Sequence, residues 1–430
     1  MDVKIQTLFR ILAILTMGRI FLPIVFTNIP FPFSSILVYT FLWVGGCILV
    51  YPDILISKRL RYIYLFIFVF VFGIEILWQD RIVGWGDLLN YNWLLSEIIP
   101  VFLAILIFTY FLRTKDLKGM AYVVAIALVF ITITSLTSII GLNKYPMAAR
   151  ELAGALTKTG REDLIAYYSS IGIASFGFFT ALSFVFPVLI YKYKILWKNR
   201  FSYLWLIYGV MLLMFIVALI EAKYTMAIIF AFTFAIISLI KIKDQRKLIY
   251  ISVCIVIIII SIPTQYISGL LYNVSELFEG TLTEERISDL AQTIENPVID
   301  RAAETHVGSK LGRIPLLFES IISNPITGGG ANYGHNFWLD RLSMFGIIGI
   351  IPWFLIIYNQ LKTNLKILGD DFKPYYLLSM IAFISAGFIN NMSGHQMFSI
   401  VFFVIPGIYF LKYINVRSYI DINKNKNVVS

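Results

Sequence analysis

The residues best suited to chemistry lie in a short polar stretch before an apolar run. His335 follows the glycines of 328–330 and Gly334, and Asn336 begins the apolar run. An imidazole can exchange a proton near neutral pH, and glycines permit positive φ and close backbone approach. A helix that starts at Asn336 would present unpaired amides and a positive dipole, which suits an anion. The alternative is a flexible loop whose glycines serve only for turning.

Cationic side chains are the second candidate group, and each one alone has the ordinary interpretation of solvated surface or lipid headgroup contact. They lie in polar segments that are otherwise acidic: Arg150, Lys158, Arg161, Lys223, Arg286, Arg301, Lys310 and Arg313. Lys223 differs, because Glu221–Ala222–Lys223 is a three-residue hairpin between two apolar runs. A charge confined there is a functional hypothesis by default. Motifs of soluble nucleotide-binding enzymes, serine hydrolases and zinc enzymes are absent from the sequence, and no metal or cofactor is expected.

The elements that must position these residues are membrane helices. Hydrophobic residues make up 59% of the 430, aromatic residues 16%, and the mean hydropathy is +0.82. A membrane span needs about 20 apolar residues. The sequence predicts an all-α polytopic membrane protein with about twelve spans in a single domain, 1–430. The spans are 8–28, 33–51, 60–78, 94–112, 120–140, 171–191, 202–220, 224–240, 248–268, 337–358, 376–393 and 396–412. Arg10 and Arg19 make the first span the least regular.

Charge predicts the orientation of these spans. With a cytoplasmic N-terminus and twelve crossings, most of the 35 basic residues fall on the inside segments and most of the 25 acidic residues fall outside. This is the positive-inside pattern, and it places both termini in the cytoplasm. The net charge of +10 is thereby explained by topology and by anionic lipid, and it does not indicate nucleic-acid binding.

Two outside loops, 141–170 and 269–334, hold most of the polar sequence. In the larger loop, Thr281 and Glu284 have capping-box spacing before apolar residues at 287, 290, 291 and 294, which predicts a short amphipathic helix. A second such helix is predicted over 314–322, ended by Asn324–Pro325. In the smaller loop, apolar residues at 149, 152, 153 and 156 have the same spacing. Loops this long tend to be functional.

The segment 313–349 resembles the C-terminal signature of the O-antigen polymerase and O-antigen ligase superfamily of bacterial envelope glycosyltransferases. The matching features are Arg313, the amphipathic helix, Asn324–Pro325, Gly328–Gly330, His335–Asn336, Leu339 and Gly346-x-x-Gly349. Gly346 and Gly349 by themselves have the spacing of close helix packing. The number of spans and the large outside loop extend the similarity over the whole chain.

The resemblance implies a multi-pass protein of the bacterial cytoplasmic (inner) membrane, with the two outside loops in the periplasm. It implies a polysaccharide polymerase that transfers a growing glycan from undecaprenyl pyrophosphate onto a new lipid-linked repeat unit. The glycan would be O-antigen or a capsular or exopolysaccharide. A flippase and a chain-length regulator of the same pathway are the implied protein partners.

The resemblance also assigns residues. His335 and Arg313 would be catalytic, and Lys223 occupies a position that is usually Arg in the family, so the bidentate fork is lost there. Arg161 and Arg301 match an Arg-x10-Gly pattern of some polymerases, and with Lys223 and Asn336 they would bind pyrophosphate. Glu221 and Asp340 remain alternatives to His335 as the general base. Two other functions stay open, namely an O-antigen ligase that transfers polymer to lipid A-core and a polysaccharide flippase.

Overall fold

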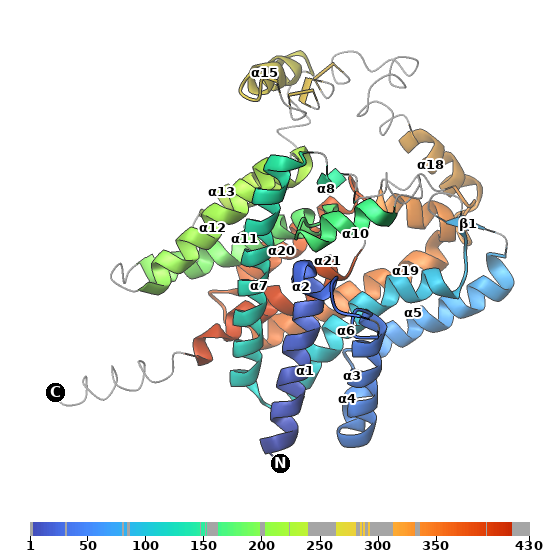
Figure 1. Ribbon diagram of the computed structural model, residues 1–430. Coiled ribbons are helices and arrows are strands. Elements are labelled where there is room, and N and C mark those ends of the chain that lie inside the picture. The colour runs from blue at the N-terminus through green and yellow to red at the C-terminus, as the bar shows by residue number, and fades with distance from the viewer. Residues whose placement is uncertain are drawn as a thin grey trace.

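Long apolar runs form the helices of this protein, as expected where backbone groups must be satisfied within each segment. The computed structural model describes residues 3–30, 32–79, 81–83, 87–146, 148–150, 152, 162–197, 203–222, 224–239, 264–280, 284–285, 287–288, 291–292, 313–331, 336–392 and 394–414. Figure 1 shows the helices packed into one bundle, with α15 and α18 on the side opposite the N-terminal end of α1.

The N-terminal third contains α1 (Val3–Phe21), α2 (Pro23–Phe26), α3 (Ile36–Val50), α4 (Pro52–Leu55), α5 (Arg61–Phe72), the π-helix η1 (Gly73–Leu77), α6 (Tyr91–Arg113) and α7 (Leu117–Lys144). A two-stranded antiparallel pair, β1 (Ile82–Val83) and β2 (Asp87–Leu88), lies between η1 and α6 and pairs Ile82 with Leu88. Side-chain oxygens of Ser35, Asn90 and Asp116 accept hydrogen bonds from the first-turn amides of α3, α6 and α7, as N-cap residues do.

The middle of the chain contains α8 (Ala148–Arg150), α10 (Glu162–Ser170), α11 (Phe176–Trp197), α12 (Tyr203–Glu221), α13 (Thr225–Leu239), α15 (Thr264–Glu276) and α18 (Arg313–Ser323). The C-terminal part contains α19 (Phe337–Ile367), α20 (Lys373–Ala386), α21 (His395–Ser399), the π-helix η3 (Ile400–Val404), α22 (Ile405–Gly407) and the 3-10 helix η4 (Ile408–Tyr413).

Six helical segments of the described chain are long and apolar enough to cross a membrane: Tyr91–Arg113, Leu117–Lys144, Phe176–Trp197, Tyr203–Glu221, Phe337–Ile367 and His395–Tyr413. Most of α6 and α11 is buried, whereas most of α12 faces outward. Its outward residues are apolar, for example Leu206 and Leu213. An apolar exterior of this kind suits a lipid environment, so the prediction of a mostly helical membrane protein is confirmed.

Helices coincide with every predicted span except 248–268, most of which lies outside the described residues. The last residues of that predicted span, 264–268, belong to α15. The apolar residues Ile267, Leu270, Leu271 and Val274 recur at the spacing of one helical face, so α15 is an amphipathic helix across the predicted loop boundary. The smaller loop also has helical ends, since α7 continues to Lys144 and α10 occupies 162–170.

The predicted amphipathic helices of the larger loop agree with the structure where it describes them. Residues 284–285, 287–288 and 291–292 are helical, with Ile287 and Ala291 buried. The second helix is α18, which ends at Ser323 directly before Asn324–Pro325. Leu317 on its inner face is buried, whereas Ile322 is 75% exposed.

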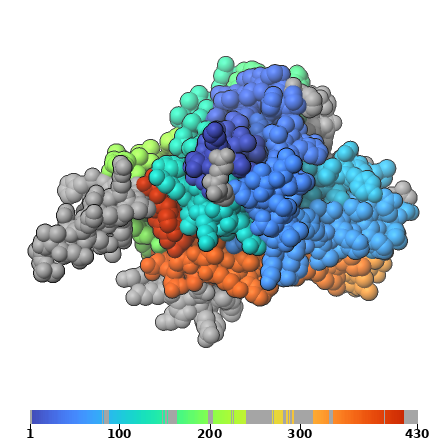
Figure 2. Space-filling view, turned by 90° about the horizontal axis from the view of Figure 1, so that it is seen from below, coloured from blue at the N-terminus to red at the C-terminus, as the bar shows by residue number. Residues whose placement is uncertain are grey.

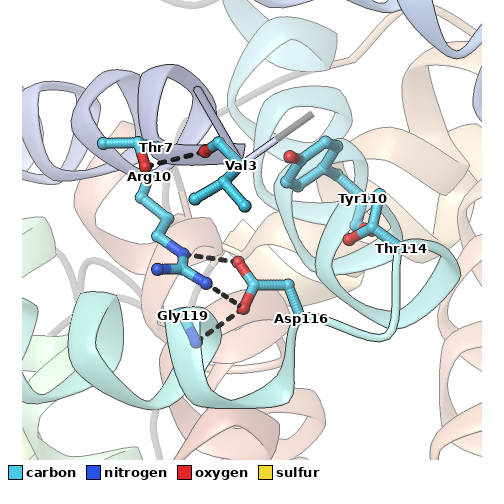
Figure 3. A network of polar contacts seen from close by, with 7 residues as sticks. All are labelled: Val3, Thr7, Arg10, Tyr110, Thr114, Asp116 and Gly119. Carbon is cyan, nitrogen blue, oxygen red and sulfur yellow. Dashed lines mark hydrogen bonds and ion pairs between the residues drawn. The ribbon is translucent and has the colours of Figure 1, made fainter. Parts of the chain in front are cut away.

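The irregular feature of the first span, Arg10, is neutralised by a partner at the start of α7. The Arg10 guanidinium contacts the Asp116 carboxylate through Nε at 2.6 Å and Nη2 at 2.7 Å (Figure 3). The same carboxylate accepts a hydrogen bond from the Gly119 amide at 3.0 Å. The pair joins α1 to the α6–α7 turn, so Arg10 does not interrupt the helix.

Segments predicted to lie inside share one face of the molecule. Figure 2 shows the molecule from below, where the start of the chain (dark blue), the blue segment of α3–α5, the teal segment of α7 and the orange segment of α19–α20 lie side by side. Two hydrogen bonds connect the start of α5 to the end of α19: Arg59 donates to the Asn364 side chain at 2.7 Å, and Asn359 donates to the Lys58 carbonyl at 2.9 Å. The ends of α11 and α13, also predicted to lie inside, are joined by Lys194, which donates to the Leu239 carbonyl at 3.0 Å. The core above this face is rich in aromatic contacts, such as Phe66 against Trp353.

Candidate functional site

The polar stretch after α18 folds back onto α19. Gly328 and Gly330 adopt positive φ of 82° and 89°, as their types allow. The amides of Gly329 and Gly330 donate to the Ser343 carbonyl at 2.8 and 3.1 Å. A Cβ on Gly328 would lie 2.4 Å from the Met344 carbonyl, so this contact between two backbones requires glycine.

Helix α19 is broken at the point where this loop meets it. Gly346 has φ 61° and ψ −163°, outside the helical region, so the helix axis changes direction there. The amides of Ile347 and Ile348 donate to the carbonyls of Pro325 and Ile326 at 2.9 and 3.1 Å. The loop thus supplies the partners that the break removes, as a membrane helix requires. The interpretation of Gly346 as a packing glycine is therefore wrong, because it allows a positive φ.

Arg81, from the β1 side of the α5–α6 connection, holds the loop in place. Its guanidinium donates to the carbonyls of Met344 and, at 2.8 Å, of Gly328. The indole of Trp78 donates to the Thr327 carbonyl at 2.9 Å. Burial lowers the pKa of Arg81. The cation lies at the C-terminal end of the first half of α19, where the helix dipole favours positive charge.

The start of α19 is where the sequence predicts it, with Asn336 as the N-cap residue. Asn336 is buried, and its backbone amide donates to the Asp340 carboxylate at 2.8 Å. The next two amides are also used, since Phe337 donates to the Asn390 carbonyl at 3.2 Å and Trp338 to the Gly387 carbonyl at 3.1 Å. The expectation of unpaired amides for an anion is wrong for these three groups, because Asp340 and the α20–α21 connection already pair them.

A buried ion pair lies one turn further along α19. Arg341 contacts the Glu97 carboxylate of α6, and both residues are at least nine-tenths buried. The guanidinium carbon lies 3.4 Å from the centroid of the Phe337 ring and 5.8 Å from that of Trp353. The Nε of Arg341 has no hydrogen-bond partner within the described chain. Aromatic rings and one carboxylate thus hold a cation next to the start of α19.

The residues predicted for catalysis and pyrophosphate binding are described only in part. Arg313 is the first residue of α18, and its side chain is outside the described set. His335, Lys223, Arg161 and Arg301 also lie outside the described residues.

The elements around Lys223 are described. Helix α12 ends at Glu221 and α13 starts at Thr225, so the connection is as short as predicted. The Tyr224 hydroxyl donates to the Ala149 carbonyl of α8 at 2.7 Å. This bond ties the α12–α13 hairpin to the smaller outside loop.

Sequence reasoning did not single out Arg81 and Arg341. The available signal was a charged residue in an unusual position. Arg341 lies inside the predicted span 337–358, and Arg81 is one of the few basic residues on the predicted outer side of the membrane. Their partners are two backbone carbonyls and a glutamate about 240 residues away in sequence, which no local pattern reveals. Among the residues that the structure describes, no group of three or more His, Cys, Asp or Glu side chains is arranged to hold a metal ion.

The chain matches no model of a known protein family, and its sequence matches no curated protein.

Proposed function

We propose that this protein is a membrane-embedded polysaccharide polymerase of the O-antigen type. The observation that carries the proposal is the interlock of the residues that bear the resemblance. Pro325 and Gly329 both bond to α19 on either side of Gly346. The described stretch after α18 and the first half of α19 are therefore joined by main-chain bonds, and this supports reading the signature as one functional segment.

The proposed reaction is the transfer of a glycan from one lipid pyrophosphate to another lipid-linked repeat unit. A hydroxyl of the acceptor sugar attacks the anomeric carbon of the donor glycan. The bond from that carbon to the pyrophosphate oxygen breaks, and its electron pair leaves with undecaprenyl pyrophosphate. The hydroxyl proton passes to a general base, a step that contributes about 10²- to 10⁴-fold in rate.

In this proposal His335 is the base, and Arg313, Lys223, Arg161 and Arg301 stabilise the departing pyrophosphate. One preorganised donor of this kind contributes roughly 3 kcal/mol to the transition state. Asn336 positions the start of α19 beside the leaving group. Asp340 is the weaker alternative base, because its carboxylate is buried and accepts the Asn336 amide. Glu221, at the end of α12, stays an alternative.

The proposal includes twelve crossings, retains the predicted crossing over 248–268, and places both termini in the cytoplasm of a bacterium. The loops 141–170 and 269–334 then face the periplasm, where lipid-linked repeat units are joined. The contacts among described loops support this arrangement. Trp78 bonds to Thr327 and Tyr224 to Ala149 on one side, and Arg59 bonds to Asn364 on the other.

The direct test uses the purified full-length protein with synthetic undecaprenyl-pyrophosphoryl repeat units, and gel analysis of the products. We expect a ladder of glycans from the wild type and none from His335→Ala or Arg313→Ala. Arg313→Lys should also fail if the guanidinium binds pyrophosphate with two hydrogen bonds. The control is Arg61→Ala, because Arg61 is exposed at the opposite end and, among the described residues, its side chain bonds to that of Tyr62. Ladders from both alanine variants would refute the site.

The same assay separates the two other functions. A single transfer of preformed polymer to lipid A-core, with no ladder, would identify a ligase. Movement of labelled lipid-linked glycan across a vesicle membrane without any transfer would identify a flippase. In a deletion strain, lipopolysaccharide capped by one repeat unit would support the polymerase. The partners expected in cells are the flippase and chain-length regulator of the same pathway.

A further inference from the structure

Two basic residues lie at the adjoining ends of α1 and α21. Arg19 is in the last turn of α1, and His395 is the first residue of α21. The next residue of each helix joins the two, since the Gln396 side chain donates to the Ile20 carbonyl at 3.1 Å. This bond places the first turn of α21, which holds His395, against the last turn of α1, which holds Arg19. Figure 1 shows α21 beside the upper end of α1.

Neither side chain is neutralised by an acid in the described part of the chain. The ion pairs found there are Arg10–Asp116, Arg341–Glu97 and Lys373–Asp370. Arg19 uses its Nε to donate to the Ser34 carbonyl, so the two terminal nitrogens of its guanidinium have no partner assigned among those residues. A partly buried cation without an acid is costly unless another anion accompanies it.

His395 carries the second observation that points to a ligand. Its Nδ1 is buried without a hydrogen-bond partner among the described residues, and an unsatisfied buried polar atom is unfavourable. His395 as a whole residue is half-buried, so it lies near the surface of the bundle. A ligand can therefore reach the ring from the outer face and provide the interaction that the protein does not.

The surroundings fix the positions of both groups. Gly394, directly before His395, has φ 105°, a conformation that turns the chain sharply into α21. The Gln396 side chain accepts from the Ser175 hydroxyl at 3.5 Å in addition to its bond to Ile20. Tyr39 is buried and lies close to Arg19. The three helices α1, α11 and α21 thus hold the pair in place.

We propose that Arg19 and His395 form a binding site for the phosphate group of a membrane lipid. A guanidinium offers paired N–H donors that match phosphate oxygens, and an imidazole can donate or accept beside it. The site is at the outward end of membrane-crossing helices, which is the depth of a lipid headgroup.

If the proposed function holds, the site has a specific role in it, and the assignment of that role rests on the proposed function. A polymerase binds two lipid pyrophosphates at once, because the pyrophosphate of the acceptor is not cleaved. Phe398, one turn after His395, contacts the Phe337 ring with centroids 6.4 Å apart. The first turn of α21, which holds His395, is therefore adjacent to the start of α19. The Arg19–His395 pair is therefore placed to hold the acceptor pyrophosphate while the donor reacts.

The test measures binding of farnesyl pyrophosphate and of inorganic pyrophosphate to the purified full-length protein by calorimetry. In Arg19→Gln and in His395→Gln, we expect the dissociation constant for farnesyl pyrophosphate to rise at least about tenfold, as for the loss of one charge-assisted hydrogen bond. Arg19→Lys keeps the charge and should lose less. The control is Lys144→Gln, since Lys144 is an outward cation at the end of α7 that lies over the Tyr145 ring.

Each outcome decides one part of the inference. Equal affinity of the wild type and both glutamine variants for farnesyl pyrophosphate would overturn the site. Equal affinity of the wild type for the two probes would overturn the preference for a lipid. A protein that binds through Arg19 and His395 but forms no glycan ladder would refute the proposed function and leave the site. Formation of a glycan ladder, together with unchanged affinities in both glutamine variants, would refute the site and leave the proposed function.

Discussion

At the scale of single residues, the most constrained charge of the described chain is Arg341. Its guanidinium lies against the ring of Phe337 and contacts the carboxylate of Glu97. Two opposite charges taken out of water gain little net stability as a pair, but one of them alone is strongly unfavourable. The main effect of the pair is therefore that neither buried charge is left without a partner. The pair also links α6 to the half of α19 that begins at Asn336.

Glu97→Ala should destabilise the protein by about 3–5 kcal/mol, because it leaves a buried cation without a partner. Combining it with Arg341→Met should cost much less than the sum of the two single changes. Chemical unfolding in detergent, followed by tryptophan fluorescence, measures all three variants. The matched control is Asp370→Ala, because the Asp370 carboxylate is accessible and pairs with Lys373 at the surface; it should cost far less than Glu97→Ala, since exposed ion pairs add little stability. Equal stability of Glu97→Ala and the wild type would contradict the account.

At the scale of elements, the break in α19 is the central device of the candidate site. A continuous helix would carry Phe337–Ile367 through in one direction and would leave the glycine loop without backbone partners. With Gly346 at φ 61°, the carbonyl of Ser343 and the amides of Ile347 and Ile348 are free to bond the loop. The loop after α18 and the middle of α19, which are more than ten residues apart in sequence, are thus joined by main-chain hydrogen bonds. Such bonds depend little on side-chain identity.

Gly346→Ala should disrupt this lock. An alanine would have to keep a positive φ, which costs about 1–3 kcal/mol, and its Cβ would lie 2.3 Å from the Ile326 carbonyl oxygen. We expect a loss of at least about 2 kcal/mol and a melting temperature lower by several degrees in detergent. Gly45→Ala in α3 is the control, because a Cβ there meets nothing within 4 Å and alanine favours a helix. A similar melting temperature for the two variants would show that the break tolerates a side chain.

These elements show what the sequence could predict. Hydropathy predicts where the described helices lie, because about 20 apolar residues in a row have few other stable forms in a membrane. The end of α18 is also predictable, because Asn324–Pro325 is a local signal that stops a helix. The break at Gly346 could not be predicted, since the same Gly-x-x-Gly spacing serves helix packing. The pairing of the first α19 amides with Asn390 and Gly387 depends on tertiary contacts, so a free helix N-terminus was expected there instead.

At the scale of the whole molecule, contacts between distant segments follow the predicted sides of the membrane. The α4–α5 turn bonds to the end of α19 through Arg59, and the end of α13 bonds to α11 through Lys194. On the other side, the loop after α18 bonds to Arg81, and Gln396 bonds to Ile20. The charge pattern alone predicts this sorting, because basic residues are retained on one side during insertion.

Single cysteines at two exposed turns test this arrangement. In a chain with Cys47 and Cys254 changed to serine, Asn324→Cys should react with a membrane-impermeant maleimide in intact bacterial spheroplasts, because the proposed topology puts the end of α18 in the periplasm. Asp370→Cys, in the exposed turn between α19 and α20, should react only after permeabilisation, because the proposed topology puts this turn in the cytoplasm. Since α19 is the one helix between the two positions with the length to cross, their labelling must differ if it crosses. Equal labelling of both in intact spheroplasts would mean that the broken helix returns to the side from which it started, and the even number of crossings would be lost with it.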